Sequence, residues 1–374
     1  MDFLVLTKVH GAILGPISQI LGWILNVLVT FTNSFGVLNI GLSIILFTLV
    51  VKLLMFPMTI KQQKASKLMA VMQPELQAIQ AKYKGKTDND SMMKMNVETK
   101  AVYEKYGTSM TGGCLQLVIQ MPILFALYRV IYCIPAYVMP VKEHFLNVVY
   151  ALTGTSSASA LSEGAAANLL QFATDHNISL TGINPIGDLT GVTGEALANK
   201  MVDILYKLNP AQWGDLAQAF PNAADVISNN AATIERMNTF LGINLASNPF
   251  NGSFVPSLAW LIPILAGLTQ YASTKLMMAT QPKKNNEEDM SSQMMQSMNV
   301  TMPLMSVFFC FTFPAAIGIY WVASSTFQLL QQLVVNSYLD KVDMDELIRK
   351  NVEKANKKRA KKGLPPQKVN QNAT

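Results

Sequence analysis

A single lysine, Lys52, interrupts the otherwise uncharged sequence IILFTLVVKLLMFPM, which runs from Ile44 to Met58. An ionised side chain in the middle of a bilayer costs roughly 3 kcal/mol or more, so it indicates a function or a partner. The next lysine, Lys61, marks the expected membrane surface. Lys52 lies about 13 Å deeper along a helix that rises ~1.5 Å per residue, which is further than a lysine stem reaches. Snorkelling therefore does not account for Lys52.

A buried ion pair does not account for it either, because residues 39–60, 113–134, 256–280 and 300–336 contain no Asp or Glu. Water or polar side chains must then solvate the ammonium group. Polar side chains recur at helical spacing in these four apolar segments. They are Thr48, Thr59, Gln116, Gln120, Gln270, Ser273, Tyr320, Ser324 and Gln328. The pattern predicts a hydrated groove around Lys52, although each stripe taken alone is also typical of a helix–helix contact.

The elements that must position these residues are membrane-spanning helices. The chain is 50% hydrophobic and 14% charged, against ~25% charged in typical soluble domains. Several apolar runs reach the ~20 residues needed to cross a bilayer. The run 300–336 is too long for one helix, and Pro314 is expected to divide it. The sequence predicts an all-α polytopic membrane protein with a core of five spans.

The expected segments follow one another without a gap. They are 1–36, an N-terminal amphipathic or transmembrane helix; 37–60, the first core span; 61–111, a cytoplasmic helical hairpin; 112–134, the second span; 135–255, an extracytoplasmic loop domain; 256–280, the third span; 281–299, a cytoplasmic linker; 300–337, the fourth and fifth spans; and 338–374, a basic cytoplasmic tail.

The distribution of basic residues predicts the orientation, because lysine and arginine concentrate on the cytoplasmic side. Residues 61–111 hold nine lysines, and the tail from Tyr338 holds ten Lys or Arg. The 121 residues from Pro135 to Val255 hold only four. The first core span therefore starts outside, and the carboxyl terminus is cytoplasmic. Residues 11–32 are either an interfacial amphipathic helix or a sixth span, and the polar positions four residues apart favour the interfacial helix.

The predicted hairpin carries several methionines, whose flexible side chains adapt to varied partners. They are Met69, Met72, Met92, Met93 and Met95. We expect these residues to contact substrate helices, although ordinary packing within the hairpin is an equal alternative. The basic tail is expected to be disordered. No role is assigned to the outer loop.

Catalytic chemistry is not indicated. Cys114, Cys133 and Cys310 are isolated and lack metal-ligand spacing, and the three histidines are scattered. There is no nucleotide-binding P-loop motif. The sequence predicts a protein that is not an enzyme and has neither a metal nor a cofactor.

The chain resembles the YidC family of bacterial membrane protein insertases. The resemblance rests on NIGLSIILFTLVVKLLMFPMTIKQQKASKLMAVMQPELQAIQAKYKG, YEKYGTSMTGGCLQLVIQMPILFALYRVI, LAWLIPILAGLTQYASTKLMM and MPLMSVFFCFTFPAAIGIYWVASSTFQLLQQ, roughly half of the chain in the family's order. It implies a five-helix core around a groove open to cytoplasm and lipid, in the plasma membrane of a bacterium of Gram-positive type. It also implies a cation in the groove at Lys52, where many members have arginine. Gln116 and Ser325 depart from the family pattern, and the outer loop is larger than in many relatives.

The resemblance implies an insertase and chaperone for nascent membrane proteins, with Lys52 transiently attracting acidic residues of the translocated tail. Its expected partners are the clients and the lipid bilayer. The basic tail would meet the ribosome or the signal recognition pathway, and the general secretion channel is a further candidate. Two alternatives remain: a secondary transporter, for which repeats and an intramembrane carboxylate are missing, and an assembly scaffold that does not insert.

Overall fold

The computed structural model describes residues 11–107, 112–178, 180, 186, 188–250, 256–279, 290–361, 363 and 365–366. The side chains of residues 112–120 and 290–296 lie outside this description, as do those of a few single positions. Two compact units emerge from the contacts between residues. The first contains residues up to Val50, Met121–Leu268 and Leu304–Ser324. The second contains Val51–Gln120, Thr269–Pro303 and the residues from Ser325 on.

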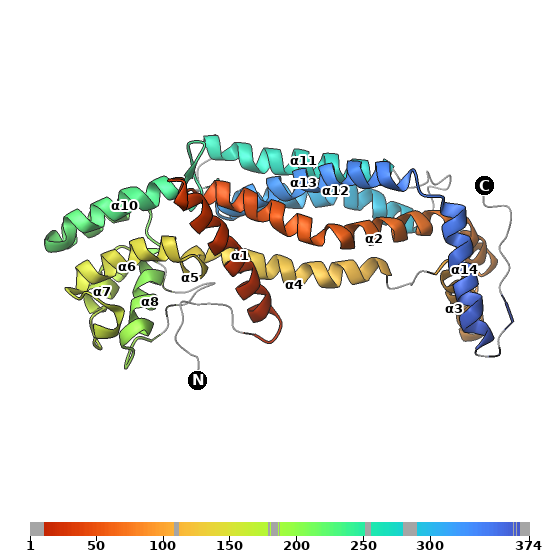
Figure 1. Ribbon diagram of the computed structural model, residues 1–374, viewed down its shortest axis with the longest axis horizontal. Helices are drawn as coiled ribbons and strands as arrows, with labels where there is room; N and C mark the ends of the chain where they lie inside the picture. Colours follow the sequence, from red (N-terminus) through yellow and green to blue (C-terminus); the bar gives the residue numbers. More distant parts are fainter. Residues whose placement is uncertain are drawn as a thin grey trace. The chain divides into compact units, whose positions relative to one another are not determined.

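Helices form almost all of the described structure (Figure 1). The longer helices are α1 (Leu14–Ser34), α2 (Ile40–Lys82), α3 (Asn89–Tyr106), α4 (Gly112–Tyr132), α6 (Met139–Thr153), α8 (Gly194–Leu205), α10 (Ala224–Asn238), α11 (Leu261–Ala279), α12 (Met290–Thr312), α13 (Ala315–Leu339) and α14 (Met344–Ala360). The shorter elements are α5 (Ile134–Tyr137), η1 (Ala158–Ala160), α7 (Ala167–Asp175), α9 (Pro210–Ala219), η2 (Pro221–Ala223), β1 (Thr239–Phe240), β2 (Ile243–Asn244) and η3 (Leu258–Trp260).

The outer loop folds as a helical domain within the first unit. Helix α6 packs against α8 and α10, and α10 also packs against α9. The core between them is apolar, with Phe145, Leu197, Met201 and Ile227 each at most 1% exposed. After α10, strands β1 and β2 form a short antiparallel pair, and β1 contacts α10.

The break between α12 and α13 falls at Phe313 and Pro314, as the sequence predicts. A helix end leaves backbone groups without partners, which must be satisfied elsewhere. Here residues 245–248, which follow strand β2, supply the hydrogen-bond partners. The Ala315 and Ala316 amides donate to the carbonyls of Ser247 and Leu245 at 2.9 and 3.0 Å. The side-chain amide of Asn248 donates to the Thr312 carbonyl at 3.1 Å.

Helix α1 packs on α5 and α6 by its small and polar side. Ser18 and Gly22 are buried, and the Asn26 side chain accepts a hydrogen bond from the Met139 amide at 2.8 Å. Large apolar side chains point the other way: Ile20, Trp23, Val27 and Phe31 are 44–67% exposed. One face of α1 therefore packs against protein, and the other exposes large apolar side chains.

Three boundaries in the second unit differ from the sequence-based expectation. Helix α2 continues through Lys61 to Lys82, so the first arm of the hairpin is the same helix as the first span. Helix α12 starts at Met290 rather than at residue 300. The tail forms helix α14, where the sequence predicted disorder. Neither proline nor glycine occurs in residues 60–64, 290–300 or 344–360, and a change from apolar to polar side chains does not end a helix.

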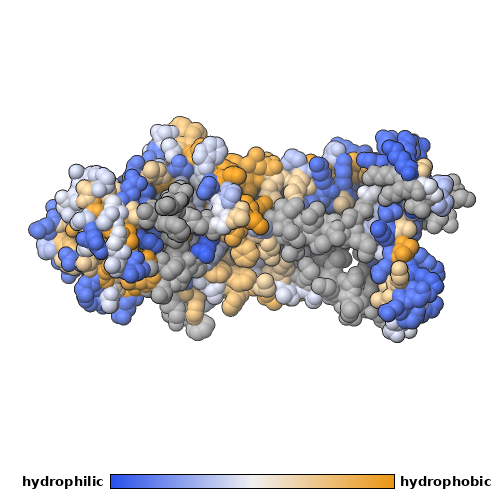
Figure 2. Space-filling model, turned by 90° about the horizontal axis from the view of Figure 1, so that it is seen from below, coloured by the Kyte–Doolittle hydropathy of each residue, from blue (hydrophilic) through white to orange (hydrophobic). Residues whose placement is uncertain are grey.

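The helices of the core leave many large apolar side chains exposed. Leu53, Leu54, Leu268, Leu304, Phe308 and Val334 are each at least 57% exposed. Figure 2 shows hydrophobic side chains gathered on the face that it draws. The described side chains of α3 and α14, in contrast, are mostly hydrophilic. A soluble monomer rarely exposes apolar surface on this scale. By length and composition, α1 and residues Ile40–Met69 of α2 each suffice to cross a membrane.

A close approach at Gly22 generates a first prediction. A β-carbon at Gly22 would overlap the ring of Tyr137. We expect Gly22→Val to detach α1 and to lower the stability of the first unit by about 1–3 kcal/mol, the usual cost of overpacking. The measurement is thermal unfolding of the protein in detergent.

Gly214→Ala is the matched control. Gly214 lies in α9 with no atom within 4 Å of an added β-carbon. Alanine in a helix interior is favoured over glycine by about 0.5–1 kcal/mol. Equal melting temperatures for both variants would contradict the packing described for α1.

Candidate functional site

Lys52 lies in the second unit on α2 and is half-buried. Within the described part of the chain, its ammonium group forms neither an ion pair nor a hydrogen bond. Its backbone is held instead: the Gln331 side chain of α13 donates to the Lys52 carbonyl at 2.8 Å. The structure therefore fixes the helical turn that carries the charge and leaves the ammonium group without a protein partner among these residues.

A proline weakens the helical hydrogen bonds of α2 one residue beyond this contact. Pro57 lies inside α2, and a proline has no amide hydrogen to donate to the carbonyl four residues before it. The carbonyl of Leu53 therefore lacks its hydrogen-bond donor within the helix, and the helical hydrogen bonding is weakened in the turn that begins with Lys52. The bond from Gln331 ties this turn to α13.

Further polar contacts lie on the same helix pair. Gln63 of α2 and Gln332 of α13 exchange hydrogen bonds at 2.7 and 3.3 Å. Gln332, which is 4% exposed, also donates to Asn336 at 2.8 Å. Because each carboxamide both donates and accepts, this pair is satisfied without a charge. Elsewhere in the second unit, Thr269 of α11 bonds to Ser325 of α13 at 2.6 Å.

The other predicted groove residues fall in both units. Thr59, Gln270, Ser273 and Gln328 belong to the second unit with Lys52, and Thr48, Tyr320 and Ser324 to the first. The Thr48 and Thr59 hydroxyls donate to carbonyls of their own helix, at 2.7 and 3.2 Å. Gln116 and Gln120 lie on α4, but their side chains are outside the described residues. The contacts of Gln331 and Gln332 were not predicted, although their position on the polar side of α13 was a signal for them.

The predicted methionine surface divides into two groups. Met92 and Met93 are exposed on α3, at 45% and 70%, and Met95 is half-buried. Met72 is fully buried and Met69 packs beside it, in a cluster with α14. Met72 and Met69 therefore follow the alternative stated above, packing within the hairpin, with α14 as the additional partner.

A buried ion pair joins the two arms of the hairpin. The Lys105 ammonium group, 6% exposed, lies 2.7 Å from Glu75, and the Tyr106 hydroxyl donates to the same carboxylate at 2.7 Å. Burial and the neighbouring Glu75 raise the pKa of Tyr106 well above its usual range, so the hydroxyl remains a donor. These contacts fix α3 beside α2.

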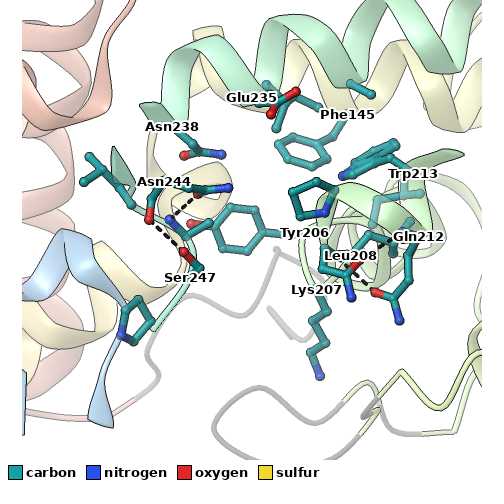
Figure 3. A pocket seen from close by; sticks show the side chains of 18 of the residues that line it. Phe145, Tyr206, Lys207, Leu208, Gln212, Trp213, Glu235, Asn238, Asn244 and Ser247 are labelled. Carbon is teal, nitrogen blue, oxygen red and sulfur yellow. Dashed lines mark hydrogen bonds between the residues drawn. The ribbon is translucent and has the colours of Figure 1, made fainter. Parts of the chain in front are cut away.

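The outer domain contains a cavity of about 900 Å³, lined only by residues of the first unit. Phe145, Tyr206 and Trp213 form an aromatic side, and Asn238 and Asn244 contribute amides (Figure 3). The cavity contains none of the predicted groove residues. Its aromatic residues come from separate helices without a spacing pattern, which is why the sequence did not reveal it.

Together these features define a polytopic helical membrane protein with one lysine, Lys52, in an apolar segment of α2 and a folded helical hairpin. Within the described residues, no group of three or more metal-ligating side chains occurs. The sequence matches the family described as "60Kd inner membrane protein" over residues 30–159 and 218–342. The chain belongs to this family, and it is a multi-pass protein of the plasma membrane.

Similar proteins carry insertase names. The membrane protein insertase YidC of Oceanobacillus iheyensis is 27% identical, over 82% of this chain and 78% of its own. The membrane protein insertase MisCA of Bacillus subtilis is 25% identical, over 83% and 76%. The membrane protein insertase YidC 2 of Listeria innocua is 23% identical, over 93% and 82%. These similarities extend through most of the chain.

The bond between Gln331 and Lys52 generates a second prediction. Gln331→Leu keeps the size of the side chain and removes the donor, so we expect the protein to lose about 0.5–1.5 kcal/mol of stability, the net value of a hydrogen bond. Gln328→Leu is the matched control, since Gln328 is also half-buried on α13 but forms no hydrogen bond with a described residue. The measurement is thermal unfolding in lipid nanodiscs. Equal losses in both variants would show that the Gln331 contact has no stabilising role.

Proposed function

We propose that this protein inserts newly made membrane proteins into the lipid bilayer through a polar groove that contains Lys52. The observation that carries the proposal is the half-buried ammonium group without an ion-pair partner among the described residues, on a chain of the insertase family. A charged side chain inside the membrane costs free energy. A role in binding the substrate during insertion would explain why the chain keeps this charge. The established members of this class act without an enzymatic reaction.

The groove would lower the barrier for the polar tail of a client. A tail crossing unmodified hydrocarbon loses its water, whereas polar side chains and water on the cytoplasmic side shorten the apolar distance. The apolar segment of the client then moves into lipid, where each buried methylene contributes about 0.8 kcal/mol. The exposed leucines beside Lys52, Leu53 and Leu54, support a lateral route into the lipid.

Lys52 would attract acidic residues of the tail for a short time. Two unit charges 4 Å apart attract by about 1 kcal/mol in water and more at lower dielectric. An inside-negative membrane potential adds ~2.3 kcal/mol per charge and 100 mV in the outward direction for an acidic tail. The attraction must remain weak enough for the acidic tail to be released. A single solvated lysine meets this requirement.

The orientation follows from the charge distribution together with the position of α1. We place the outer domain outside the cell and α3 and α14 in the cytoplasm, in line with the lysine-rich segments. The middle of α1 contacts Tyr137 and Met139, just beyond the end of α4 at Tyr132. The middle of a spanning helix would lie about 15 Å deeper, at the bilayer centre. This geometry supports an interfacial α1 with Trp23 and Phe31 in the lipid.

The partners of this function are nascent membrane proteins. The positively charged α14 and the residues after it would add an electrostatic contact, to ribosomal RNA or to anionic lipid. The general secretion channel is a further proposed partner. A secondary transporter is disfavoured because the spans lack a carboxylate for ion coupling. A scaffold that does not insert clients would leave Lys52 without a use.

Insertion in proteoliposomes tests the role of Lys52. The clients are two single-span proteins that differ only in an acidic or a neutral translocated tail. Lys52→Gln and Lys52→Glu should reduce insertion of the acidic tail about fivefold or more, the equivalent of ~1 kcal/mol, and affect the neutral tail less. Protease protection of the tail measures insertion.

Lys61→Gln controls for charge alone, because Lys61 is exposed and lies nine residues further along the same helix. Lys52→Arg should retain activity, since it keeps the charge. If wild type and all variants insert both tails equally well, Lys52 is not a receptor for acidic residues. If wild type adds nothing to lipid alone, the insertase proposal itself fails.

Labelling of single cysteines tests the orientation, in a protein whose own cysteines are replaced by serine. Ser159→Cys in the outer domain should react with a membrane-impermeant maleimide in intact cells. Lys86→Cys, in the exposed turn between α2 and α3, should react only after the membrane is opened. The reverse pattern would contradict the proposed topology.

A further inference from the structure

The apolar faces of the hairpin meet in a groove that α14 fills. The hairpin groove consists of Leu68, Met72 and Leu76 of α2 with Val102 and Tyr106 of α3. Ile348 and Val352 of α14 insert into it and are 6% and 5% exposed. Figure 1 shows α14 beside α3, and the two helices are in contact. Without α14, these apolar side chains would face the cytoplasm.

Two polar contacts hold α14 in register. The Asn351 side chain donates to the Tyr106 carbonyl at 3.0 Å, at the end of α3. The Arg359 guanidinium group lies 3.6 Å from the Glu104 carboxylate, a partly exposed pair. Gly107 is required here, because a β-carbon would come within 3.0 Å of Asn351, and its φ of +68° favours glycine. The groove thus recognises a helix with apolar residues four apart and a basic residue further along.

The contact between α14 and the hairpin groove has the features of a reversible contact. Among the described side chains of α14, two are buried in the cluster, and Leu347 packs beside them. The remaining surface of α14 is strongly hydrophilic and carries exposed lysines, including Lys350, Lys354 and Lys357. A segment of this kind does not depend on the groove for solubility. The linker from Leu339 to Met344 keeps α14 close to the groove after release, so that it can rebind.

We propose that the hairpin groove is a receptor for the apolar helix of a client with basic residues on its C-terminal side, and that α14 is its resident occupant. The inference rests on the insertase function proposed above. Met69 and Met72 suit such a receptor, since methionine adapts to helices of different shape. Helices of this description are the segments that enter the membrane and keep their basic flank in the cytoplasm. A client helix displaces α14, and α14 returns when the client moves on.

The test compares two variants that change the net charge equally. Ile348→Asp with Val352→Asp removes the buried side chains of α14 and releases it, and Lys350→Gln with Lys354→Gln alters only exposed positions. Each pair lowers the net charge by the same amount. A chain that ends at Asp343 removes α14 outright and serves as a second release variant. Amide hydrogen exchange of α14 verifies its release.

The readout is crosslinking to a ribosome-bound client from a photo-reactive phenylalanine at Tyr103, a half-buried position at the groove. Both release variants should increase the yield at least about threefold, the change expected if α14 covers the groove in two thirds of the molecules. The lysine variant should match wild type. The same vesicles report insertion by protease protection.

Three results would overturn the inference. Release of α14 without a rise in crosslinking would show that the groove does not receive clients, even where insertion is normal. Crosslinks from Tyr103 only to ribosomal components, or only to a second copy of this chain, would assign the groove to a different partner. Failure of insertion by wild type as well would instead contradict the proposed function, and the two failures are thus distinguishable.

Discussion

The lack of hydrogen-bonding solvent in the bilayer constrains every part of this protein. Backbone groups in hydrocarbon must bond within their own segment, which makes helices the structure of choice. Where a helix stops, other groups have to replace the missing bonds. The turn at Pro314 illustrates this, because segment 245–248 satisfies the amides of Ala315 and Ala316. Pro57 creates a second defect, and Gln331 binds the neighbouring carbonyl.

The same constraint explains how a charge is kept on α2. Lys52 is placed by its backbone, through a neutral glutamine, and not by a carboxylate among the described residues. A carboxylate would hold the ammonium group strongly and occupy the position that a substrate needs. A neutral contact to the main chain fixes the location and leaves the charge available. The proposed function requires that the backbone of Lys52 is held in place while its ammonium group stays available to bind a substrate.

The sequence was sufficient for the parts of the fold that rest on strong local signals. The break at Pro314 follows from a single residue, because proline cannot continue the hydrogen bonds of a helix. The end of the first span was not predictable in this way. In the proposed orientation the surroundings of α2 change near Lys61 from lipid to water, and nothing in the backbone chemistry of residues 61–64 ends a helix. For the site, Lys52 was identified from its charge, whereas the Gln331 contact requires knowledge of which helices are neighbours. Helix α14 was missed because its composition is that of a solvated tail, and only the spacing of Ile348 and Val352 revealed an apolar face.

The reciprocal pair of Gln63 and Gln332 has a consequence for the conditions under which the protein works. Two carboxamides carry no net charge and do not titrate, so neither ionic strength nor acidity weakens their mutual attraction as it weakens that of an exposed ion pair. The junction between α2 and α13 therefore keeps its geometry when the cell gains or loses salt. The bond of Arg359 to Glu104 is screened under the same conditions. The polar contact that joins α2 to α13 is therefore insensitive to the salt content of the cell, whereas the small contribution of the ion pair to the attachment of α14 is not.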